Sequence, residues 1–298
     1  MFAPSRRSQF VSVSDRGRQA LNGVRMIARP VVRSVGRPIA GALAGRAPKT
    51  ISAMFRVKNE EEYLGAALES IIDLVEEVII VDNLSTDSTA AIIADFRHRH
   101  PAKVRDFSYP HPLARYGDEN TDLASTRAGR RSPALLANYY NWCLAHCTHP
   151  FILKWDGDTV ATAKFGLALA EFRTSRKQCL WHIGANLHQD GQHLIAGVPF
   201  EAPEPRLFYR RFAKYTNALE YCELLESPYV YPSERYIARA AEPLYVHMKY
   251  CKTDRFSNMS ADLQAAALLL DAVGEPISPI VREAIERWHL GPAPATAD

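Results

Sequence analysis

The stretch FILKWDGDTV, residues 151–160, runs from an apolar segment straight into two carboxylates, Asp156 and Asp158, with only Gly157 between them. A short apolar run of this kind is consistent with a buried strand. Asp-Gly is also a favoured dipeptide of hairpin turns, so the pair alone indicates either a turn or a cation site. Residues two apart in an extended segment project to the same side, so both carboxylates can reach one ligand.

The segments upstream alternate between strand-like and helix-like patterns. Residues 51–57 (ISAMFRV) and 77–83 (EVIIVDN) are continuous apolar runs of the kind that central parallel strands need, because both of their faces are covered. Between them, apolar residues recur at helical spacing after Asn59, which with Glu62 forms a capping-box-like helix start. A second helix follows the second strand. The order strand, helix, strand, helix predicts an open α/β sheet wound in the Rossmann manner.

The pattern continues toward the opening stretch. Residues 103–109 (KVRDFSY) read as a third strand, residues 111–132 as a long polar loop, and an aromatic-rich helix then leads to residue 151. In open α/β sheets, ligands bind at the carboxyl ends of the strands. We therefore expect Asp82, which follows VIIV, to lie at the same edge as Asp156 and Asp158.

Beyond residue 160 the pattern becomes mixed. A helix is followed by short strands and loops, and two further helical patterns occupy residues 261–273 and 278–290. No Gly-rich dinucleotide motif and no P-loop motif occurs in the chain. A bound phosphate group would therefore need another counter-charge.

The composition divides the chain near residue 50. Residues 1–50 hold ten basic side chains and one acid, a net charge of +9, whereas the remainder has a net charge of −6. We predict a basic N-terminal segment (1–49), a folded domain (50–290) and a flexible tail (291–298).

Three interpretations of the N-terminal segment remain open: a surface for anionic membranes, a solvated tail and an organelle-targeting presequence. Vesicle co-sedimentation of the full chain against a version starting at Lys49 tests the first, since equal pelleting at low salt would contradict it.

The whole chain has ordinary globular composition, with 47% hydrophobic and 23% charged residues. No apolar run approaches the ~18 residues of a membrane span, and no secretory signal is recognised. The five cysteines have scattered spacings, which argues against a disulfide framework and for a reducing compartment. We expect a cytoplasmic protein, with peripheral contact at the inner face of the cell membrane as an open question.

Three ordered segments, RVKNEEEYLGAALESI, EVIIVDNLSTDSTAAI and ILKWDGD, resemble the opening of a family-two glycosyltransferase of bacterial type. The likeness covers residues 51–160 well and extends loosely to about residue 250 through PRLFYRR and YVHMKY. The resemblance implies a GT-A fold: a Rossmann-like, mostly parallel sheet flanked by helices, with a nucleotide-sugar site and a mixed, acceptor-side second half.

The resemblance also implies roles for the carboxylates at the strand ends. Asp158 would coordinate Mn²⁺ or Mg²⁺, and Asp156 would contact the donor sugar or ribose, in part through the metal. Asp82 takes the position of the carboxylate that recognises the nucleobase, with a helix cap or a loop acid as the alternative. Such a metal stabilises the negative charge on a departing diphosphate, and hard carboxylate oxygens suit it.

Arg56, Asn59 and Glu60 follow the first strand, where the resembling family lines its nucleotide pocket. For Asn59 a helix cap is the alternative, and for Glu60 a solvated acid.

A late histidine closes the metal site in many GT-A enzymes, and His247 is the candidate here. Alternation in EPLYVHMKY places it on the polar side of a strand, and a surface histidine is the alternative. Lys249 and the basic residues Arg206, Arg210 and Arg211 are candidates to face the diphosphate, with a solvated face as the alternative.

Inverting transfer requires a carboxylate base that takes the proton of the acceptor hydroxyl. In related bacterial enzymes a glutamate follows an R-L-F segment by somewhat more than ten residues. Here Glu223 is closest in spacing and Glu220 second, although Cys222 replaces the histidine that the family has before this glutamate. A surface acid is the alternative for both.

The sequence thus predicts a metal-dependent hexosyltransferase that moves a sugar from a nucleotide-sugar donor, UDP-linked by first expectation, to an acceptor hydroxyl with inversion. The resemblance implies a glycan or lipid-linked acceptor, as in assembly of cell-envelope polysaccharide, and no nucleic-acid partner is expected. One rival is a sugar-phosphate nucleotidyltransferase, whose Gly-rich loop after the first strand is missing here. The other is a non-catalytic nucleotide-sugar-binding protein.

Overall fold

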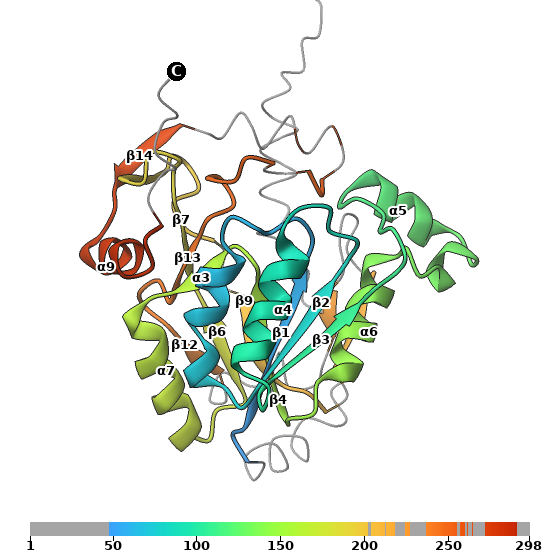
Figure 1. The fold of residues 1–298 in the computed structure, drawn as a ribbon, viewed down its shortest axis with the longest axis horizontal. Coiled ribbons are helices and arrows are strands. Elements are labelled where there is room, and N and C mark those ends of the chain that lie inside the picture. Colours follow the sequence, from blue (N-terminus) through green and yellow to red (C-terminus); the bar gives the residue numbers. More distant parts are fainter. Residues whose placement is uncertain are drawn as a thin grey trace, which may run out of the picture.

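The structure is a computed structural model (Figure 1). It describes residues 48–201, 204–211, 213–217, 224–226, 237–254, 257–259, 261, 264 and 272–290. The expected N-terminal segment up to residue 47 and the tail from residue 291 therefore lie outside the described residues. None of the helices in the described ranges has both the length and the apolar character needed to cross a bilayer.

A seven-stranded sheet forms the centre of the molecule. In spatial order its strands are β12 (Ile237–Arg239), β6 (Cys179–His182), β9 (Glu204–Tyr209), β4 (Phe151–Asp156), β1 (Ile51–Val57), β2 (Glu77–Asp82) and β3 (Val104–Ser108). Strands β4, β1, β2 and β3 are parallel, as are β12 and β6, whereas β9 runs antiparallel to both of its neighbours. The prediction of an open, mostly parallel α/β sheet is confirmed.

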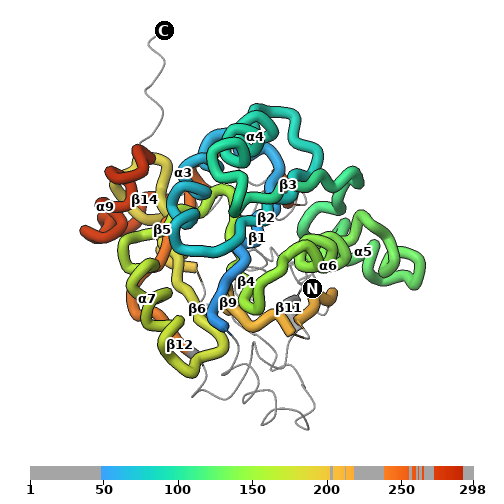
Figure 2. The backbone as a smooth tube through the Cα atoms, turned by 60° about the horizontal axis from the view of Figure 1, so that its bottom comes forward, coloured from blue at the N-terminus to red at the C-terminus, as the bar shows by residue number. Residues whose placement is uncertain are grey.

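Helices cover both faces of this sheet (Figure 2). They are α3 (Leu64–Glu69), the 3-10 turn η2 (Ile72–Leu74), α4 (Thr89–Arg99), α6 (Leu136–His146) and α7 (Ala163–Thr174). Alternate residues of β1 explain the layers, because Phe55 packs in one core with residues of α3, α4 and α7, while Met54 packs in a second core with residues of α6. Burial on both faces is what made these strands continuous apolar runs.

The helix after Asn59 begins later than the capping-box pattern indicates. Asn59 has a left-handed backbone (φ 54°), and its Oδ1 accepts a hydrogen bond from the backbone N–H of Thr86 at 2.9 Å. The helix α3 starts only at Leu64 and ends at Glu69, where η2 takes over after a short break. The helix-cap interpretation of Asn59 is therefore wrong, because its side chain ties the β1 loop to the loop after β2.

The polar segment 111–132 is not loop throughout. It contains the helix α5 (Asp118–Ser125) and the 3-10 turn η3 (Gly129–Arg131). Both elements contain few apolar residues, so the sequence shows no hydrophobic periodicity that would predict them.

The second half of the chain builds small sheets beside the main one. A three-stranded sheet has the order β5 (Thr159–Ala161), β13 (Tyr245–His247), β7 (Gly184–Asn186). Two further pairs are β8 (His193–Ile195) with β14 (Val273–Pro276), and β10 (Lys214–Thr216) with β11 (Leu224–Glu226). The predicted helix at 278–290 is α9 (Pro279–Arg287), whereas most of the one at 261–273 lies outside the described residues.

Candidate active site

The carboxyl ends of neighbouring parallel strands bring charged side chains to one edge of the main sheet. In the strand register Arg56 on β1 is the partner of Asp156 on β4, and Asp82 ends β2 on the other side of β1. Asp158 lies in the turn between β4 and β5. The three aspartates expected at one edge are indeed at that edge, so parallel pairing alone accounts for the location of the site.

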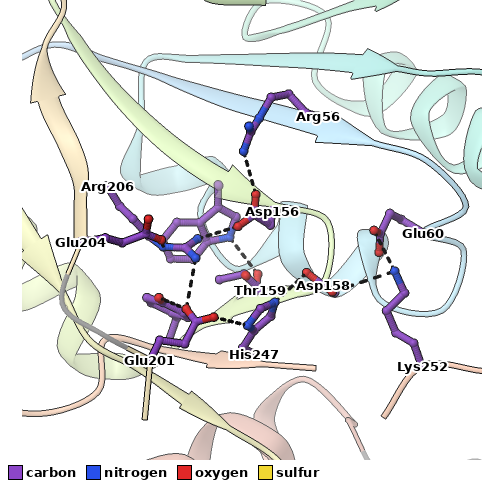
Figure 3. Close-up of polar contacts among 12 residues, drawn as sticks. Arg56, Glu60, Asp156, Asp158, Thr159, Glu201, Glu204, Arg206, His247 and Lys252 are labelled. Carbon is purple, nitrogen blue, oxygen red and sulfur yellow. Dashed lines mark hydrogen bonds and ion pairs between the residues drawn. The ribbon is translucent and has the colours of Figure 1, made fainter. Parts of the chain in front are cut away.

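Asp156 is held by two arginines (Figure 3). Its Oδ1 accepts from Arg56 at 2.9 Å and its Oδ2 accepts from Arg206 at 2.8 Å. Burial acts to raise the pKa of Asp156, but the positive charges of Arg206, Lys154 and Arg56 outweigh it and keep the pKa well below its usual range. Asp156 is therefore an anion whose two oxygens are both occupied by guanidinium groups in this structure.

Asp158 faces a histidine. Its Oδ1 lies 3.3 Å from Nε2 of His247, and the other ring nitrogen, Nδ1, lies 2.6 Å from Oε1 of Glu201. Strand β13 carries His247 into this place, and the backbone N–H of Met248 donates to the carbonyl of Asp158 at 2.8 Å. His247 is 7% exposed, which excludes a surface histidine. Burial lowers its pKa, but Glu201 and Asp158 outweigh burial and raise the pKa to about 10.

A second acid and a lysine stand on the other side of the turn. Nζ of Lys252 lies 2.8 Å from Oε1 of Glu60 and 3.9 Å from Oδ2 of Asp158. Burial, with the Asp158 charge, raises the pKa of Glu60 to about 8 although Lys252 opposes the shift. Glu60 lies against Gly157, where a Cβ would come within 2.8 Å of its Cγ. Lys249 is half-buried, and burial lowers its pKa.

Glu60 is thus not a solvated acid. One of its oxygens is paired with the lysine and the other, Oε2, is buried without a hydrogen-bond partner. Glycine at the centre of the carboxylate pair is what allows this glutamate to pack so closely.

Asp82 is half-buried at the end of β2, and its Oδ1 accepts a hydrogen bond from the hydroxyl of Ser85. The following loop is fixed from within, because the buried amide of Asn83 donates to the carbonyls of Tyr109 and His111 at 3.1 and 2.8 Å. Leu84 next to it is exposed and has a left-handed backbone (φ 57°).

Arg206 is not on a solvated face. Its side chain is 3% exposed, it forms ion pairs with Asp156, Glu201 and Glu204, and it lies over the ring of Tyr245 at 4.5 Å from the centroid. The arginine on β9 therefore belongs to the same network as the β4 carboxylates. The two base candidates, Glu223 and Glu220, lie outside the described residues and stay predictions.

The pair formed by Asp158 and His247 fits a divalent cation. Ligand atoms ~2.1 Å from one ion and at right angles lie about 3 Å apart, close to the 3.3 Å seen here. Within the described ranges, no three or more His, Cys, Asp or Glu side chains are grouped to hold a metal. Two protein ligands suit an ion of the Mg²⁺ type, which keeps several waters and takes the remaining ligands from substrate phosphates.

Two residues of this site were not predicted from the sequence. Glu201 lies in the segment between β8 and β9, and Lys252 follows β13, and neither belongs to a recognisable motif. The sequence did hold a weak indication for Arg206, the partner of Glu201, because it is a charged residue inside the apolar run PRLFY. Its burial implies that carboxylates must meet it.

A comparison with protein-family models supports the resemblance for part of the chain. Residues 52–115 match the family model described as Glycosyl transferase family 2. No curated protein matches the chain significantly.

Among solved structures, S. aureus TarS is 14% identical with a TM-score of 0.36, over 74% of this chain and 39% of that chain. The glucosyl-3-phosphoglycerate synthase from Mycobacterium tuberculosis, in complex with Mn²⁺, UDP and glucosyl-3-phosphoglycerate, is 17% identical with a TM-score of 0.40. That match covers 78% of this chain and 83% of the synthase. The resemblance to family-two glycosyltransferases is confirmed for residues 52–115, which hold most of β1, all of β2 and β3, and the helices between them.

Proposed function

We propose that this protein is a metal-dependent glycosyltransferase that moves a sugar from a nucleotide-sugar donor, preferably UDP-linked, to an acceptor hydroxyl with inversion. One observation carries the proposal. Asp158 and His247 present an oxygen and a nitrogen 3.3 Å apart at the end of β4, beside the segment that matches the glycosyltransferase family. A turn alone would not require a buried histidine at this place.

The charges around this pair suit a diphosphate. A divalent cation bound by Asp158 and His247 would supply positive charge that stabilises a departing diphosphate. Lys252, whose ammonium lies 3.9 Å from the other oxygen of Asp158, adds a fixed positive charge beside the same carboxylate. Glu60 holds this lysine in place at 2.8 Å. The chain itself thus contributes a basic group to compensate the charge that builds up during transfer.

The nucleotide part of the donor is assigned to the ends of β1 and β2. We assign recognition of a nucleobase ring N–H to the carboxylate of Asp82. Arg56 is fixed by Asp156 and by the ring of Tyr140, over which its guanidinium lies 3.7 Å from the centroid. Because Asp156 is an anion, its contact with the donor would be with ribose or sugar hydroxyls, which can donate a hydrogen bond to it, rather than with phosphate oxygens, which it repels.

The base stays assigned to Glu223, with Glu220 as the second candidate. One in-line displacement needs one base on the side of the sugar opposite the diphosphate. A glycan or a lipid-linked hydroxyl is the proposed acceptor, in the cytoplasm or at the inner face of the cell membrane. The division into a basic segment (1–49), a transferase domain (50–290) and a tail is part of the same proposal.

A donor screen on the full-length protein tests this function. UDP-, GDP-, CMP- and dTDP-sugars are compared by thermal shift with and without Mn²⁺, followed by assays for sugar hydrolysis and transfer. A ligand at ~100 times its Kd stabilises the native state by about 2.7 kcal/mol. We expect UDP-sugars to raise Tm only with Mn²⁺ and to be turned over. Stabilisation without turnover would favour a binding protein, and turnover of a sugar phosphate with a nucleoside triphosphate would favour a nucleotidyltransferase.

A further inference from the structure

Glu201 lies at the centre of the site, although no motif includes it. Its Oε1 is 2.6 Å from Nδ1 of His247. Its Oε2 accepts hydrogen bonds from the hydroxyl of Tyr245 and from Nη2 of Arg206, the latter at 3.2 Å. Both carboxylate oxygens are thus occupied by donors (Figure 3). The side chain is only 22% exposed.

The contact with Glu201 decides which nitrogen of the histidine faces Asp158. The pKa of Glu201 is held low, so its carboxylate can only accept and Nδ1 must be the donor in this contact, which leaves Nε2 facing Asp158 Oδ1 at 3.3 Å. Histidines that ligate metals commonly donate their other ring N–H to a carboxylate, which fixes the ring orientation and raises the basicity of the ligating nitrogen.

The same carboxylate also reaches the other half of the Asp156–Gly157–Asp158 turn. Arg206, bound to Glu201, donates through Nη1 to Oδ2 of Asp156 at 2.8 Å. One side chain therefore supports both aspartates, one through a histidine and one through an arginine.

We propose that Glu201 is the positioning residue of the cation site, orienting His247 so that Nε2 and the Asp158 carboxylate can bind one divalent ion together. This inference rests on the proposed function for the presence of the cation, and it assigns Glu201 no contact with substrate. Removing the carboxylate should weaken the ion's bond to the histidine nitrogen more than its bond to the Asp158 oxygen.

The test is Mn²⁺ binding by the full-length protein without nucleotide. Free Mn²⁺ is titrated by electron paramagnetic resonance, and pulsed measurements detect the nitrogen coupling of a bound imidazole. Glu201→Gln is expected to lower Mn²⁺ affinity by ~10–100-fold, the usual effect of losing a supporting carboxylate, and to reduce the nitrogen coupling. Tyr245→Phe is the matched control, because it removes a hydrogen bond to the same carboxylate without touching His247. It should leave Mn²⁺ affinity close to that of the wild type and the coupling intact, because His247 keeps its contact with Glu201.

Wild-type affinity with intact nitrogen coupling in Glu201→Gln would overturn the inference, and so would equal losses in Glu201→Gln and Tyr245→Phe. Absence of Mn²⁺ binding by the wild type would overturn it too. Glu201→Asp, which keeps the negative charge near Arg206, replaces the amide variant if that variant does not fold, and a loss of nitrogen coupling is again expected. Sugar transfer is measured separately: Glu201-dependent Mn²⁺ binding in a chain without transfer would uphold the inference and contradict the proposed function.

Discussion

Replacing Asp158 with asparagine removes the negative charge of the proposed metal ligand while keeping its size. We expect Asp158→Asn to abolish metal-dependent donor binding and sugar transfer. Loss of a supporting group around a metal costs up to ~100-fold in affinity, so loss of a direct ligand should lower Mn²⁺ affinity at least that much, or by about 2.7 kcal/mol.

The fold should survive this change, as the local contacts show. Asp158 lies near two basic groups, Nε2 of His247 at 3.3 Å and Nζ of Lys252 at 3.9 Å. After the substitution each basic group still has one carboxylate partner, because Glu201 is 2.6 Å from the histidine and Glu60 is 2.8 Å from the lysine. Losing one charge-assisted hydrogen bond costs about 1.5–3 kcal/mol, which corresponds to a fall in Tm of about 3–12 °C.

Calorimetric Mn²⁺ titration and a transfer assay at saturating Mn²⁺ measure the two effects of Asp158→Asn. Glu204→Gln is the control, because Glu204 pairs with Arg206 and Lys154 in the same network without contacting Asp158. Its Mn²⁺ affinity should stay close to that of the wild type, because both proposed ligands, Asp158 and His247, are untouched. Near-normal turnover by Asp158→Asn would show that the stretch at residues 151–160 is a turn and would refute the reasoning.

Three further predictions follow from the site and the core. Glu223→Gln is expected to lower kcat by at least ~100-fold with donor affinity unchanged; if Glu220→Gln alone is inactive in the same assay, the base lies three residues earlier. His182 is fully buried, neither ring nitrogen has a hydrogen-bond partner, and burial lowers its pKa to about 3. The unfolded chain, with a histidine pKa of about 6.5, therefore binds more protons between these values, and stability is lost as pH falls. The free energy of unfolding, measured with urea, should fall between pH 7 and ~4 by about 3 kcal/mol less in His182→Phe than in the wild type. Equal falls in the two proteins would contradict this prediction. Gly157→Ala would place a Cβ 2.8 Å from Cγ of Glu60, so we expect lower Mn²⁺ affinity in a folded protein. Unchanged affinity in the same calorimetric titration would mean that the glutamate packing is dispensable.

Much of the fold could be predicted because it is encoded by local patterns. The apolar runs became β1, β2 and β4, and parallel pairing then brought Asp82 and Asp156 to one edge without any further information. The same logic failed for Asn59. Its left-handed backbone and its hydrogen bond to Thr86 depend on a loop 27 residues away, and no helical pattern contains that contact.

The rest of the candidate site depends on contacts between distant parts of the chain. Glu201 and His247 are 46 residues apart, and Glu60 and Lys252 are 192 residues apart. An acid in a loop carries no periodic signal, so only the three-dimensional structure distinguishes Glu201 from a solvated glutamate. The alternation in EPLYVHMKY also could not predict that His247 is buried, because the polar side of this strand faces Asp158 and Glu201 instead of solvent.

The most direct test of the central claim is calorimetric titration of UDP into the full-length protein, once with saturating Mn²⁺ and once after chelation. If Asp158 and His247 hold a cation that in turn binds the diphosphate, UDP should bind with Mn²⁺ and at least ~10-fold more weakly without it, a difference of about 1.4 kcal/mol. In Asp158→Asn this metal dependence should disappear. Equal UDP affinity with and without Mn²⁺ in the wild type would contradict the account.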